Sequence, residues 1–134
     1  MGPARAPTAP LSRRRMHGDR GEIAADTAIF AAVVLLVFFC VQFGLWFYGR
    51  QVAGSAAQHA LDAARVESGT AGAGEVTGHE FLDQVGGLDE ATVSVTRTDE
   101  TVTATVSGEP VSILGFFHVG VTATVTGPVE RIVE

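Results

Sequence analysis

The fold is decided by the stretch AIFAAVVLLVFFCVQFGLWFY, residues 28–48, which only Gln42 interrupts with a strongly polar side chain. At a rise of 1.5 Å per residue, roughly 21 helical residues cover about 31 Å, which matches a bilayer core of ~30 Å. A small soluble domain could not bury apolar side chains on every side of one helix, whereas lipid accepts them. The stretch therefore predicts one membrane-spanning helix.

Aromatic and basic residues mark the C-terminal end of this stretch. Trp46 and Tyr48 close it, and Arg50 follows two residues later. Amphipathic rings favour the headgroup level of a bilayer, where a basic side chain also reaches water. We therefore expect Trp46, Tyr48 and Arg50 at the membrane interface.

The basic residues are unevenly distributed around the span. Five arginines precede it: Arg5, Arg13, Arg14, Arg15 and Arg20. Only Arg50 and Arg65 follow it closely. Short arginine-rich flanks stay in the cytoplasm, so we expect a single-pass protein of the cell membrane with a cytoplasmic N-terminus and an extracytoplasmic C-terminus. The net charge of −6 makes nucleic acid an unexpected partner, because phosphate neutralisation needs basic residues.

The helical pattern continues beyond the membrane to about residue 66. Small residues recur at spacings of three or four along one face of this extension, at Gly49, Ala53, Ala57, Ala60 and Ala64. A stripe of small side chains lets another helix approach closely, so these five residues are helix-packing candidates. The alternative is that alanine is used here only as a good helix former.

The chain after the stalk changes character twice. Residues 67–76 are rich in glycine and predict a flexible linker. Thr77 and Glu80 then fit a capping box, which predicts a short helix that begins there and ends at Gly86 and Gly87.

Alternation with a period of two follows Gly87 and predicts a small antiparallel sheet. Valine or alanine alternates with small or hydroxyl-bearing residues over residues 93–96, 102–106 and 119–125. We expect a hairpin turn at residues 98–100, a second turn at residues 107–110, and a possible extension of the last strand over residues 129–133.

These elements predict an α+β fold in which a long N-terminal transmembrane helix extends as a stalk before a small antiparallel β tail with one short helix. The expected segments are a cytoplasmic basic leader (1–21), the membrane helix and stalk (22–66), the linker (67–76) and the extracytoplasmic domain (77–134). A tail of this size has little hydrophobic core of its own. We therefore expect it to pack against the long helix or against a partner.

The membrane segment and its flanks resemble the TadE-like family, pilin-related subunits of tight-adherence (Flp pilus) assembly systems. The similarity lies in Arg20-Gly21 followed by small residues and an acid, in the apolar helix, in the Phe-Gly-aromatic segment before Arg50, and in the Ala-rich run up to Arg65. It covers about residues 20–66.

The resemblance implies processing by a prepilin peptidase after Gly21, which would make Glu22 the new N-terminus. The family carries an acid, usually Glu, five residues beyond the cut; here that residue is Asp26. A carboxylate beside a membrane span needs a partner, and the amine of Glu22 on a neighbouring subunit is the candidate for this subunit contact. The alternative is that Asp26 is solvated and favoured by the N-terminal end of the helix.

The family further implies a pilin-like structural subunit of a pilus or related secretion apparatus. Its expected partners are the lipid bilayer, a prepilin peptidase, other pilin-like subunits and membrane assembly proteins. The alternative is a single-pass anchor, not processed, whose β domain binds a cell-envelope partner.

No residue pattern in the chain favours an enzyme, a cofactor or a metal site. His79, Glu80 and Asp83 resemble the zinc-binding HExxH helix, but Asp stands in place of the second His and no third ligand is evident. We therefore expect no catalytic residues and no metal ligands.

Overall fold

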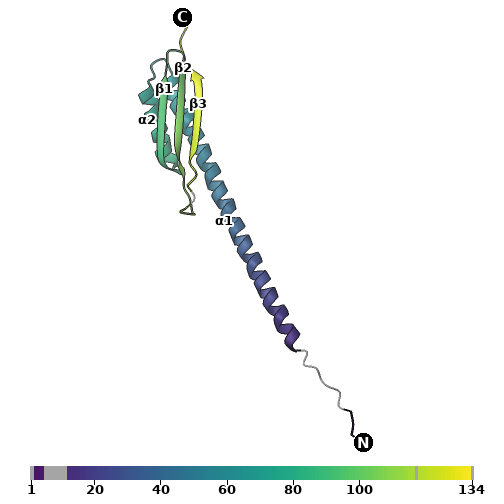
Figure 1. Cartoon of the computed structure of the whole chain (residues 1–134). Coiled ribbons are helices and arrows are strands. Elements are labelled where there is room, and N and C mark those ends of the chain that lie inside the picture. Colours follow the sequence, from purple (N-terminus) through teal and green to yellow (C-terminus); the bar gives the residue numbers. More distant parts are fainter. Residues whose placement is uncertain (1, 5–11, 117, 134) are drawn as a thin grey trace. The chain divides into compact units, whose positions relative to one another are not determined.

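The computed structural model describes residues 2–4, 12–116 and 118–133 and confirms the predicted α+β class (Figure 1). Five elements follow one another in the order α1, α2, β1, β2, β3. The chain divides into two compact units, Met1–Phe39 and Cys40–Glu134, and each is described by itself. Residues 5–11 of the predicted leader, which include Arg5, lie outside the described residues.

Helix α1 spans Ser12–Arg65 and supplies all the regular structure described in the first unit. It begins earlier than predicted, because the predicted helix started at residue 22, after the leader. No proline follows Pro10 in this part of the chain, and arginine is a good helix former. From residue 19 to residue 39 every side chain except that of Val34 is exposed. Within the described residues, Asp19–Arg65 is the one helix that is long and apolar enough to cross a membrane.

In the second unit one face of α1 is buried over its whole length. We call this the packing face, and its buried members are Gln42, Gly49, Val52, Ala53, Ala56, Ala57, Ala60, Leu61 and Ala64. Their spacing of three, four or seven keeps them on one side of the helix. The helix ends at Arg65, one residue from the predicted end.

Helix α2 spans Ala71–Val85, so the prediction of its start was wrong. The N-cap is Thr70, whose Oγ1 accepts a hydrogen bond from the backbone N–H of Ala73 at 3.0 Å. Thr77 lies inside the helix, where its hydroxyl donates to the carbonyl of Ala73 at 2.9 Å. Most of the predicted linker is therefore helical. The predicted end is confirmed, since Gly86 has a φ of 70° and its N–H donates to the carbonyl of Leu82.

Two glycines of α2, Gly74 from the predicted linker and Gly78 from the predicted helix, allow two helices to approach closely. A Cβ atom added at Gly74 would lie 2.6 Å from the carbonyl oxygen of Ala60 and 2.9 Å from the Cβ of Ala64. One added at Gly78 would lie 3.2 Å from the Cβ of Ala60. The lower helix propensity of glycine costs about 1 kcal/mol per residue, and the close packing of α2 on α1 offsets it.

The three strands form one antiparallel sheet in the order β1-β2-β3, with bounds Leu88–Arg97, Thr101–Pro110 and Val121–Pro128 (Figure 1). The predicted hairpin turn at residues 98–100 is confirmed. Its backbone closes through the N–H of Thr98, which donates to the carbonyl of Thr101 at 2.8 Å.

Two details of the sheet differ from the prediction. Residues 107–110 are not a turn, because β2 continues to Pro110, which pairs with Leu88. Gly108 fits there because a Cβ would lie 3.2 Å from the Cα of Ala91, beside an irregular register in β1. Strand β3 begins at Val121 and ends at Pro128, so residues 119, 120 and 129–133 lie outside it. A loop of residues 111–120 joins β2 to β3.

The core lies between one face of the sheet and the two helices, as the small size of the tail predicted. The sheet contributes six buried side chains: Val93, Val95, Val102, Ala104, Val106 and Val121. Helix α2 contributes Leu82, and the remainder come from the packing face of α1. The opposite face of the sheet carries threonine pairs such as Thr103 and Thr126, whose hydroxyls lie 3.1 Å apart. The tail therefore depends on α1 for half of its core.

Candidate processing, packing and membrane-interface residues

Gly21, Glu22 and Asp26 lie on exposed turns of α1 in the first unit. A Cβ added at Gly21 would meet no atom within 4 Å. Among the described side chains, Asp26 takes part in no ion pair. Gly18 and Gly21 weaken the helix by roughly 1 kcal/mol each relative to alanine.

The five helix-packing candidates lie on the packing face, and all five are buried within their own chain. Gly49 lies against Pro110, because a Cβ there would be 2.8 Å from that ring. Ala60 and Ala64 lie against Gly74 of α2. The stripe of small residues therefore packs against the sheet and the second helix of the same chain.

Gly74 and Gly78 belong to this contact, and sequence reasoning assigned them no such part. The signal was present, since two glycines four residues apart share a face of a helix. This contact was not predicted because the residues that follow the N-cap Thr70 have a composition typical of a linker.

Gln42, the one polar interruption of the apolar stretch, is buried on the packing face with 7% of its surface exposed. Its Oε1 accepts a hydrogen bond from the backbone N–H of Ile113 at 3.2 Å and lies 3.3 Å from the hydroxyl of Ser112. Sequence reasoning gave Gln42 no role, since nothing local connects it to a loop 70 residues away.

The three predicted interface residues lie at the start of the second unit. The guanidinium of Arg50 lies 5.8 Å from the centre of the Trp46 ring, within cation–π range. Trp46 is half-buried, and among the described residues its Nε1 has no hydrogen-bond partner. Tyr48 lies against Gly87, where an added Cβ would be 2.8 Å from its ring. Trp46 and Tyr48 thus have one side on the protein and one side free.

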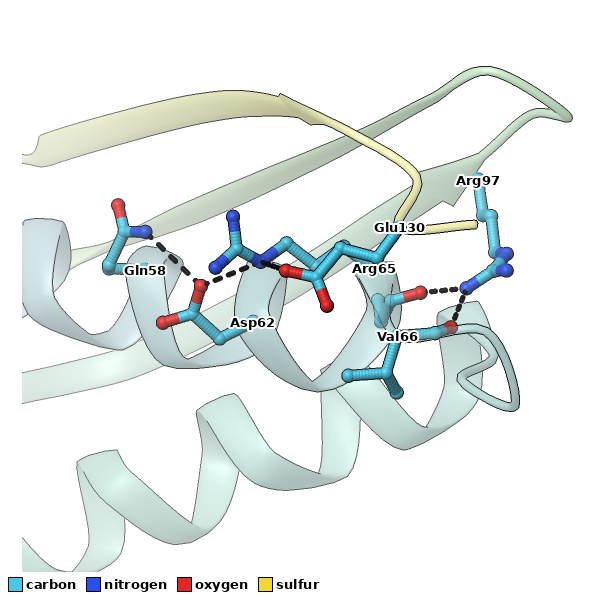
Figure 2. Close-up of polar contacts among 7 residues, drawn as sticks. Gln58, Asp62, Arg65, Val66, Arg97 and Glu130 are labelled. Carbon is cyan, nitrogen blue, oxygen red and sulfur yellow. Dashed lines mark hydrogen bonds and ion pairs between the residues drawn. The ribbon is translucent and has the colours of Figure 1, made fainter. Parts of the chain in front are cut away.

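Polar contacts hold the C-terminal end of α1 to the sheet (Figure 2). The guanidinium of Arg97 donates to the carbonyls of Ala64 and Val66, the latter at 2.9 Å. Arg65 pairs with Asp62 at 3.2 Å and with Glu130 at 3.3 Å. A cation at the carbonyl end of a helix satisfies unpaired acceptors and the helix dipole together. The end of the helix is thereby fixed to β1 and to the segment after β3.

The histidines and acids do not gather into a metal-binding group within the described part of the chain. His59 stacks on Phe81 with ring centres 4.5 Å apart. The Nδ1 atom of His118 lies 3.3 Å from a carboxylate oxygen of Glu109. These side chains have local packing partners.

Comparison with known proteins gives one family match. No curated protein and no solved structure matches the chain. The family model described as TadE-like protein matches residues 22–62. The matched segment begins directly after Gly21 and includes Asp26, Gln42, the interface residues and four of the five packing candidates. The resemblance predicted from the sequence is therefore confirmed, and residues 22–62 are similar to TadE-like proteins.

Proposed function

We propose that this chain is a pilin-like structural subunit, of the TadE type, of a tight-adherence pilus or a related secretion apparatus. The observation that carries the proposal is the family match over residues 22–62, which coincides with the part of α1 that could span a membrane. The role is structural and not catalytic. The N-terminus faces the cytoplasm and the β domain lies outside, in keeping with the five arginines ahead of the span.

The exposed turns of the first unit suit assembly. The packing face of the second unit is covered by the chain's own domain, whereas residues 19–33 are exposed on every side. This segment is therefore the surface that α1 offers to neighbouring pilin-like helices and to the membrane assembly proteins. After cleavage behind Gly21, the amine of Glu22 on one subunit would pair with the Asp26 carboxylate of the next, which neutralises a charge that is costly beside lipid.

Asp26 also separates this proposal from the alternative of an unprocessed anchor whose β domain binds an envelope partner. In a host that carries this gene together with a tight-adherence system, the gene is deleted and then restored as wild type, Asp26→Ala, Asp26→Glu or Asp19→Ala. Surface pili are counted by electron microscopy, and the membrane level of each variant is measured by immunoblot.

We expect pili with wild type, Asp26→Glu and Asp19→Ala, because the first two keep the carboxylate and Asp19 is removed by processing. Asp26→Ala should reach the membrane at the wild-type level without supporting pili. Normal piliation with Asp26→Ala, or with the gene deleted, would overturn the proposal and favour the plain anchor.

A further inference from the structure

The loop of residues 111–120 exposes large apolar side chains to solvent. Phe116 is 79% exposed and Ile113 is 55% exposed, with Val111 and Val119 exposed as well. Only one residue between Val111 and Val129 is ionisable, and that residue is His118. A small domain does not ordinarily expose four apolar side chains on one loop, so the loop is expected to have an apolar environment.

The contacts of Gln42 place this loop beside the apolar stretch of α1. Oε1 of Gln42 accepts from the N–H of Ile113 at 3.2 Å, and both residues belong to the second unit. Gln42 precedes Tyr48, the end of the apolar stretch, by six residues, or about 9 Å of helix. Interfacial apolar elements reach roughly 5–10 Å into a bilayer, which is the same depth.

Some polar groups of the loop have partners within the protein, and the others need the headgroup region or water. A backbone N–H or C=O without a partner costs several kcal/mol in hydrocarbon, so non-helical segments occur there only when the protein satisfies them. Here Gln42 satisfies the N–H of Ile113, the Ser112 hydroxyl lies 2.6 Å from the carbonyl of Leu114, and His118 Nε2 lies 3.1 Å from the carbonyl of Gly115. The hydrogen bond to Ile113 explains why a polar residue, Gln42, occurs in the apolar stretch.

We infer that the described part of this loop, residues 111–116 and 118–120, enters the extracytoplasmic leaflet of the bilayer next to α1, with Ile113 and Phe116 in contact with acyl chains. Gln42 is a positioning residue that holds the loop at this depth. The occupant of the apolar surface is lipid, because the loop is bonded to Gln42 inside the apolar stretch, where Phe43 and Phe47 are themselves exposed. The inference rests on the membrane anchoring contained in the proposed function.

Fluorescence quenching in liposomes tests the loop. The full chain carries Cys40→Ser and one new cysteine, at Phe116, Ile113, Leu36 or Ile132, labelled with an environment-sensitive fluorophore. Leu36 lies in the predicted span, and Ile132, which follows β3, is 76% exposed and is the matched control for Phe116. Each protein is reconstituted into phosphatidylcholine vesicles, with the C-terminal domain outside, and is quenched either by spin-labelled acyl chains or by aqueous iodide.

We expect the probes at positions 113, 116 and 36 to be blue-shifted, quenched by spin-labelled lipid and protected from iodide, and the probe at 132 to behave oppositely. Iodide quenching at 113 and 116 with lipid quenching at 36 would overturn the inference alone. Protection from both quenchers at 113 and 116 would identify a contact with a second copy and would overturn it too. Loss of lipid quenching at 36 would overturn the membrane anchoring as well.

Discussion

Gln42 accepts a hydrogen bond at 3.2 Å from the backbone N–H of Ile113, which lies 71 residues later in the chain. The contact joins the apolar stretch of α1 to the loop between β2 and β3. It shows that the folded domain is in contact with the helix before the apolar stretch has ended. The last part of the predicted span therefore also packs against the folded domain, and no linker separates the two.

Gln42→Leu should release the loop. The substitution leaves the N–H of Ile113 without an acceptor in an apolar site, which costs about 1–3 kcal/mol. Hydrogen exchange at the Ile113 amide, measured on the full chain in lipid nanodiscs, should become faster. The control is Gln51→Leu, because Gln51 lies on an exposed part of α1 and should leave this amide unchanged. Unchanged exchange in Gln42→Leu would show that the contact does not hold the loop.

Gly74→Ala should destabilise the domain, although alanine is the better helix former. Its Cβ would lie 2.6 Å from a backbone oxygen of α1, so the helices must separate, at a cost of roughly 1–3 kcal/mol. Gly72→Ala is the matched control, since its nearest atom is 3.9 Å away, and it should stabilise by up to about 1 kcal/mol. Thermal unfolding of the two variants in the same detergent should move in opposite directions. Stabilisation by both substitutions would contradict the close approach of α2 to α1.

Thr70→Ala should cost about 1 kcal/mol of unfolding free energy, because it removes the N-cap acceptor for the Ala73 N–H. Thr77→Ala should be neutral or slightly stabilising, because Thr77 lies within the helix and alanine has the higher helix propensity. The comparison is made by denaturant unfolding of both variants. A larger loss of stability for Thr77→Ala than for Thr70→Ala would indicate that the helix begins at Thr77.

The sequence predicted the elements that depend on long, regular patterns. The apolar stretch, the continuation of the helix to Arg65, the hairpin around residues 98–100 and the α+β class follow from periodicity and turn chemistry. Errors arose where one residue type serves two structures. Glycines at 72 and 74 fit a linker by composition, and only the proximity of Ala60 and Ala64 explains Gly74 in a helix.

The sequence also predicted only part of the candidate site. The small-residue stripe was found, but its occupant was not, because contacts with α2 and with Pro110 depend on tertiary structure. The role of Gln42 was out of reach for the same reason. Asp26 and Gly21 were found only through the resemblance, since an exposed acid and a glycine before an apolar helix are common in membrane proteins.

The most direct test of the pilin-like role is the intact mass of the protein from cells with and without a co-expressed prepilin peptidase. The peptidase should remove residues 1–21 and leave a chain that begins at Glu22. Gly21→Leu should block the cut, and Gly18→Leu, the same change three residues earlier, should not. A full-length chain in the presence of an active peptidase, or a cut at another position, would contradict the account.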